Sequence, residues 1–177
     1  MKKLLREAGP SAIALLTFAA FVLTPAPARA QTVDATCVGT VALVVNWSPG
    51  LKLLQAATDF SSGSSPNLSC VTNGSESATL TSVSGSGQLS CSTSSGVSGT
   101  AVITWTPAGG TSTIDISGLA VNSVSKLVTL TGTVSAGRFL NDNATMTFVA
   151  VESLTTECAD TDGLTQTSGA PTIVLTH

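Results

Sequence analysis

The sequence predicts an all-β fold, an antiparallel β-sandwich or flattened barrel stapled by two disulfides. After residue 30 the chain is rich in Ser, Thr, Gly and Val and has no tyrosine, and β-branched residues suit the pleated surface of a sheet. Short segments alternate inward and outward side chains with the period of a half-buried strand. Clusters of Gly, Ser, Asn and Pro interrupt the chain at intervals of roughly 10–20 residues, a spacing typical of a sandwich or a barrel.

The first 30 residues have the order of a secretory signal peptide. Lys2, Lys3 and Arg6 precede an apolar run over 12–23, and the small-residue site Ala28-Arg29-Ala30 follows. The apolar run is shorter than the roughly 20 residues that span a bilayer. We therefore expect cleavage after Ala30. Residues 31–177 would then be a single secreted β-domain, extracellular or at the cell surface, with no membrane insertion after cleavage.

The four cysteines predict the two disulfides. Cys37, Cys70, Cys91 and Cys158 all follow the leader, and an even number of cysteines in an exported protein indicates disulfide pairing. Their wide spacing disfavours a structural zinc site, which usually contains a close pair of ligands. Three connectivities are possible. Cys37–Cys70 with Cys91–Cys158 is our working choice, and the other two stay open.

The clearest strands lie in the second half of the chain. Ala101, Ile103 and Trp105 share one face of a strand, and Ile114 and Ile116 share one face of the next. The longest predicted hairpin joins residues 125–135 to residues 145–152 through a Gly- and Asn-rich loop over 136–143. Its inward-facing residues are Val128, Leu130, Val134, Met146 and Phe148. Residues 51–57 are also predicted as strand, because a short isolated helix has little to sustain it.

The charge of the exported part excludes some partners. It holds three cations, Lys52, Lys126 and Arg138, against nine carboxylates, which gives a net charge of −6. Cations this sparse form no patch that would neutralise phosphates. We therefore expect neither nucleic acid nor an anionic membrane surface as a partner, and the oligomeric state is left open.

Catalytic chemistry finds little support in the sequence. The single histidine, His177, is the last residue, a position prone to fraying, and there is no nucleophile elbow for a Ser-His-acid hydrolase. The densest carboxylates, Glu152, Glu157, Asp160 and Asp162, are the candidates for a carboxylate-dependent glycan-active enzyme. Carboxylates in such a loop are usually solvated, so we predict that the protein is not an enzyme and has no catalytic residues.

Metal and cofactor motifs are equally weak. Asp160 and Asp162 resemble the start of a calcium loop, but the later ligands of that motif are missing and Asp-Gly is common turn chemistry. The segment Asn141-Asp-Asn143 invites the same idea. We predict no cofactor and no metal site, with Asp160 and Asp162 kept as weak calcium candidates.

Two aromatic residues are the candidate ligand contacts. Trp47 lies in a turn-like segment, Asn46-Trp-Ser-Pro-Gly-Leu51, and Phe139 lies on the predicted hairpin loop. The alternative is that each side chain caps one end of the core, where an aromatic ring buries much apolar area.

Several segments resemble a known group of proteins. They are Cys37-x-Gly39, Trp47-Ser-Pro-Gly-Leu51, a Ser-Cys strand, Ser98-Gly-Thr-x-x-Ile-x-Trp105, and Gly132-Thr-Val-x-x-Gly-x-Phe139 before a late cysteine. Together they resemble small secreted actinobacterial four-cysteine β-rich proteins of unknown function. The resemblance implies a secreted β-domain and supplies no active site.

The leading functional hypothesis is a secreted or cell-surface, non-enzymatic β-domain with a binding or structural role. Its partner would be an extracellular ligand or a cell-surface component, contacted by loops at one end. A small-molecule carrier is one alternative and would need an apolar cavity. A protease inhibitor is another and would need an exposed loop braced by a disulfide. A glycan-active enzyme would need two facing carboxylates in a cleft lined by Trp47 or Phe139.

Overall fold

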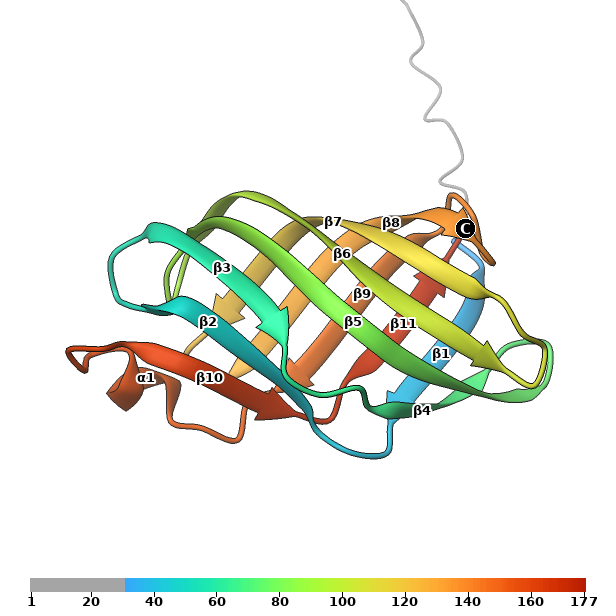
Figure 1. The fold of residues 1–177 in the computed structure, drawn as a ribbon, viewed down its shortest axis with the longest axis horizontal. Helices are drawn as coiled ribbons and strands as arrows, with labels where there is room; N and C mark the ends of the chain where they lie inside the picture. The colour runs from blue at the N-terminus through green and yellow to red at the C-terminus, as the bar shows by residue number, and fades with distance from the viewer. Residues whose placement is uncertain (1–30) are drawn as a thin grey trace, which may run out of the picture. The chain divides into compact units, whose positions relative to one another are not determined.

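Eleven β-strands and one short helix make up residues 31–177, the part of the chain that the computed structural model describes (Figure 1). The predicted signal peptide, residues 1–30, lies outside the described residues. The elements are β1 (Val33–Gly39), β2 (Leu43–Leu51), β3 (Ala56–Ser62), β4 (Asn67–Val71), β5 (Ser75–Leu89), β6 (Ser94–Thr106), β7 (Thr111–Asn122), β8 (Leu127–Gly137), β9 (Asn143–Val149), α1 (Leu154–Glu157), β10 (Leu164–Gly169) and β11 (Thr172–Thr176).

The strands close into a ring, with β5 as the strand that several others share. β5 pairs with β6 along one edge, and with β4 and then β3 along the other. From β6 the pairing continues through β7, β8, β9, β11, β1 and β4, and so returns to β5. β2 and β10 extend the sheet beyond β3. Every pairing is antiparallel, which confirms the predicted fold class in its barrel form.

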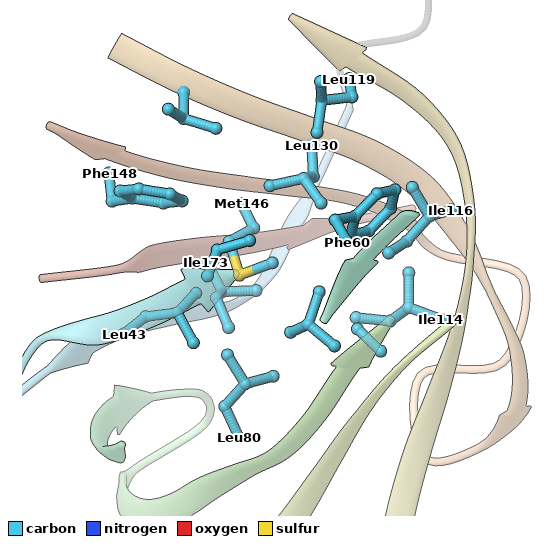
Figure 2. Close-up of a cluster of buried hydrophobic side chains, with 14 of the residues drawn as sticks. Leu43, Phe60, Leu80, Ile114, Ile116, Leu119, Leu130, Met146, Phe148 and Ile173 are labelled. Atoms are coloured by element: carbon cyan, nitrogen blue, oxygen red, sulfur yellow. The ribbon is translucent and has the colours of Figure 1, made fainter. Parts of the chain in front are cut away.

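The core fills the inside of the ring. The alternation predicted over residues 101–105, 114–116 and 128–148 is confirmed, because the inward-facing side chains of these segments are all buried. Figure 2 shows side chains from several strands, among them Leu80, Met146 and Ile173, converging on one another. The cavity between them has a volume of about 10 Å³ and an apolar lining. That volume holds no more than a single water molecule.

Two local predictions were only partly right. Residues 51–57 do not form one strand, because β2 ends at Leu51, β3 begins at Ala56 and the residues between them turn. Glu152 does not lie at a strand end, since β9 stops at Val149 and the chain bends into the helix α1. α1 was not predicted. Its four residues are held by tertiary contacts, with Leu154 buried and Cys158 bonded to Cys91.

The two disulfides connect Cys37 to Cys70 and Cys91 to Cys158, which is the connectivity we had chosen. Cys37 and Cys70 are direct partners in the β1–β4 pairing, so the first bridge reinforces an existing strand contact. The second bridge spans 67 residues and ties the β5–β6 turn to the segment after α1. It therefore connects parts of the chain that no strand pairing joins.

Among residues 31–177, no helix has the length and apolar character needed to cross a bilayer.

Candidate functional site

Polar and aromatic side chains gather at one end of the ring of strands. This is the end at which residues 138–142 connect β8 to β9. In Figure 1 this turn lies close to the labelled C end and to the start of β1. The opposite end of the ring carries α1 and the β7–β8 turn. We call residues 138–142 the β8–β9 turn from here on.

The turn has an unusual backbone that hydrogen bonds hold in place. Phe139 and Asn141 adopt φ angles of 60° and 73°. Left-handed backbone is uncommon for residues other than glycine, and for a bulky residue such as Phe139 it is an outlier. The Asn141 N–H donates to the Val134 carbonyl at 2.9 Å, and the Asp142 N–H donates to the Phe139 carbonyl at 3.0 Å. Strain of this kind persists only where the surroundings determine it.

Arg138 connects the turn to the rest of this end. Its guanidinium group donates two hydrogen bonds to Glu76, at 2.8 and 3.2 Å. Its central carbon lies 4.8 Å from the ring centre of Trp105 and 5.0 Å from that of Phe139. The Trp105 indole N–H donates to Ser112 at 2.9 Å, and the Ser112 hydroxyl donates to the Arg138 carbonyl at 2.7 Å. The result is a partly buried stack in which a cation sits against two aromatic rings.

The ion pair with Arg138 lowers the pKa of Glu76. The Arg138 hydrogen bonds are the main reason that the pKa of Glu76 lies below its usual value, and a hydrogen bond from Thr72 lowers the pKa further. Glu76 is therefore an anion held in place by a fixed cation. This arrangement is structural, since both partners already satisfy each other.

A second cluster includes the last residue of the turn, Asp142, together with Asp34 and His177. One ligand atom from each residue lies within 4.8 Å of the other two. The His177 Nδ1 atom is 3.2 Å from Asp142 Oδ1. In the described residues, no other group of three histidine, cysteine or acidic side chains lies this close together.

The sheet brings these three residues together because they stand at the same end of three neighbouring strands. β11 pairs with β1 on one side and with β9 on the other. His177 follows Thr176, whose partner on β9 is Asn143, and Asp142 precedes Asn143. Asp34 is the extra residue of a β-bulge between Val33 and Ala35. Bulges of this kind re-aim side chains and are common beside functional sites.

Asp142 is the unusual member of the cluster. Its side chain is 4% exposed, and its Oδ2 atom is buried with no hydrogen-bond partner. Burial raises the pKa of the Asp142 carboxyl, the hydrogen bond from His177 opposes that shift, and the nearby Asp34 carboxylate adds to it. The cluster thus contains two facing acids, one of them desolvated, beside an imidazole whose side chain is 71% exposed.

The two aromatic residues that the sequence suggested as ligand contacts, Trp47 and Phe139, differ in their burial. Trp47 is 3% exposed, packs on Phe60 and donates its indole N–H to Thr167 at 3.2 Å. It is therefore a core residue, as the alternative interpretation held, and offers no exposed contact surface. Phe139 is partly buried against Trp105 and lies in the β8–β9 turn beside Arg138.

The carboxylates after β9 do not converge on one site. Glu152 accepts hydrogen bonds from the backbone N–H and the hydroxyl of Ser168, at 2.9 and 2.6 Å, and so anchors the chain to β10. Asp160 and Asp162 are exposed in a turn closed by the Gly163 N–H, which donates to the Asp160 carbonyl.

Sequence reasoning missed Asp34 and set His177 aside as a frayed residue. The backbone of His177 instead exchanges two hydrogen bonds with Thr32, at 3.0 and 3.2 Å. That pairing extends the β1–β11 contact to the last residue and fixes where the imidazole lies. Asp142 belonged to the Asn-Asp-Asn segment that the sequence did single out, although for calcium.

Comparisons of the chain with protein-family models, with curated proteins and with solved structures found no match.

Proposed function

We propose that this protein is a secreted or cell-surface, non-enzymatic β-domain with a binding or structural role, and that its contacts come from the β8–β9 turn. The observation that carries the proposal is the filled interior. With a cavity of about 10 Å³, the core leaves no room for a ligand, so binding falls to the outer surface. Two disulfides are consistent with an extracellular setting.

The β8–β9 turn is the favoured contact because its shape is fixed in advance. Phe139 and Asn141 are held in left-handed backbone, and Arg138 is clamped between Glu76 and two aromatic rings. A preorganised loop loses less conformational entropy on binding than a flexible one. Leu140, at the tip, is 52% exposed and offers an apolar contact beside these fixed groups.

The rival functions receive less support. A carrier needs an apolar cavity, and the interior lacks the volume. A glycan-active enzyme needs acids that reach a sugar, whereas Glu152 is engaged by Ser168 and the side chain of Asp142 is buried. Trp47, the expected sugar-stacking residue, lies in the core.

The test combines export with binding. The intact mass of protein recovered from culture supernatant should correspond to a chain that begins at Gln31. That protein, fluorescently labelled, is then titrated onto isolated cell envelopes of the producing organism. Leu140→Ser should weaken envelope binding, while Val124→Ser should not, because Val124 is 91% exposed in the β7–β8 turn at the opposite end. Absence of envelope binding, or an effect of Val124→Ser alone, would refute the proposed contact.

A protease inhibitor remains the second candidate because of the loop between β2 and β3. Leu54 is 82% exposed there, next to Leu53. The Lys52 carbonyl accepts a hydrogen bond from the N–H of Cys91, whose sulfur is bonded to Cys158. This is an exposed apolar loop braced by a disulfide. Inhibition of a serine protease with preference for leucine, lost in Leu54→Gly, is the expected result if this function holds.

A further inference from the structure

We infer that Asp34, Asp142 and His177 form a binding site for one divalent transition-metal ion of the zinc class. The three side chains offer two carboxylate oxygens and one imidazole nitrogen, all within 4.8 Å of one another. The proposal stands on this geometry and on a buried oxygen that nothing in the protein satisfies. It holds whether or not the β8–β9 turn binds the cell envelope.

The strongest sign of a ligand is the Asp142 carboxylate. Its Oδ2 atom is buried and has no hydrogen-bond partner, in a side chain that is 96% buried and belongs to the cluster. Buried polar groups in proteins nearly always have a hydrogen-bond partner. A buried oxygen without one is therefore a place where a bound ion can be expected. A cation would satisfy this oxygen and neutralise the repulsion between the Asp34 and Asp142 carboxylates.

The mixture of ligands selects the metal. Calcium and magnesium prefer oxygen ligands alone, whereas zinc and its neighbours accept imidazole together with carboxylate. Zinc ligands at about 2.0–2.2 Å from the ion lie roughly 3.3–3.6 Å apart in a tetrahedral site. The His177 Nδ1 to Asp142 Oδ1 distance of 3.2 Å is already close to that value. The Asp34 carboxylate lies within 4.8 Å of both other ligand atoms and would have to move closer to complete the site.

The surroundings also suit an open site. The imidazole of His177 is 71% exposed, so an ion can enter from solvent and keep a water molecule in the remaining position. Three protein ligands with one open position is an arrangement that zinc commonly adopts. Because the ligands lie on β1, beside β11 and in the β8–β9 turn, the ion would cross-link three segments of the ring.

The test is a zinc titration of the full chain, freed of metal with EDTA and followed by calorimetry and native mass spectrometry. We expect one zinc ion per chain with a dissociation constant in the micromolar range, and weaker binding of calcium. His177→Gln should weaken zinc binding by at least about 10-fold, since metal affinity falls steeply with the loss of a ligand. This variant should fold, because the imidazole is mostly exposed.

A matched control separates this cluster from ordinary acidic surface. The double variant Asp160→Asn with Asp162→Asn removes two exposed carboxylates outside the cluster and should leave zinc affinity unchanged. The proposal is overturned if the wild-type chain takes up no zinc, which would leave a shared proton as the occupant. It is equally overturned if calcium binds more tightly than zinc, if His177→Gln binds zinc as the wild type does, or if the control variant loses binding.

Discussion

Replacing Asp142 with asparagine is expected to stabilise the metal-free protein. The substitution keeps the size of the side chain and retains an oxygen that can accept from the His177 imidazole. It removes the negative charge that faces the Asp34 carboxylate, and it replaces the unpartnered oxygen Oδ2 with an amide group that is a donor. An unsatisfied buried polar atom costs about 1–3 kcal/mol, so the gain in unfolding free energy should be of that order.

Zinc should reverse the ranking of the two proteins. A ligand that binds only the folded state stabilises it by about 4.1 kcal/mol when its free concentration is about 1,000 times the dissociation constant, which exceeds the gain of about 1–3 kcal/mol expected for the variant. The wild type should gain this amount, whereas Asp142→Asn, with one ligand lost, should gain much less. The variant is therefore expected to be the more stable protein in EDTA and the less stable one in zinc.

Urea denaturation measures both effects. The unfolding free energy is obtained from tryptophan fluorescence, because Trp47 and Trp105 are both buried and will report loss of the core. Asp160→Asn serves as the control and should move neither curve. A variant that is less stable than the wild type in EDTA would refute the reasoning about the unsatisfied oxygen, whatever zinc then does.

Three further predictions concern the frame around the site. Removing the second disulfide with Cys91→Ala and Cys158→Ala should lower the unfolding free energy by about 4 kcal/mol, from the loop entropy of its 67-residue separation, as measured in urea. Glu76→Gln should destabilise the protein at neutral pH, and the difference from wild type should vanish in acid. The pKa of Glu76 is lower in the folded protein than in the unfolded chain, so its ion pair stabilises the fold at pH values above the unfolded-state pKa. This stabilisation is lost as the pH falls through the folded-state pKa of Glu76. Denaturation at several pH values measures the difference between the two proteins. Trp47→Phe should cost about 2 kcal/mol in the same assay, because it leaves a buried hydroxyl without its donor, and it should leave envelope binding unchanged.

The fold was readable from the sequence because its signals are local. Alternation places Ile103, Trp105 and Phe148 inside, and the residues observed at these positions are buried. The Gly- and Asn-rich loop marked the β8–β9 hairpin for the same reason, since turn chemistry depends on a few adjacent residues. Even the disulfide pairing was consistent with the order of the strands, although the sequence alone left it open.

The candidate site was not readable, because its parts meet only through strand pairing. Asp142 and His177 are 35 residues apart in sequence, and Asp34 is farther still from both. Their proximity depends on β11 lying between β1 and β9, and on the bulge that displaces Asp34. The pattern of residues around Asp34 contains no signal of that bulge, and nothing in the sequence indicates that His177 pairs with Thr32.

Departures from ordinary backbone and hydrogen-bond rules are concentrated in one short segment. Two of the three non-glycine residues with positive φ in residues 31–177, Phe139 and Asn141, lie in the β8–β9 turn, and so does the buried unsatisfied oxygen of Asp142. Each feature lowers stability, and proteins tolerate such costs mainly where a site requires them. Shorter turns of three or four residues join several other strands of the same ring. The β8–β9 turn is therefore the segment in which we expect a binding role to be found, and the zinc and envelope assays test two separate forms of that role.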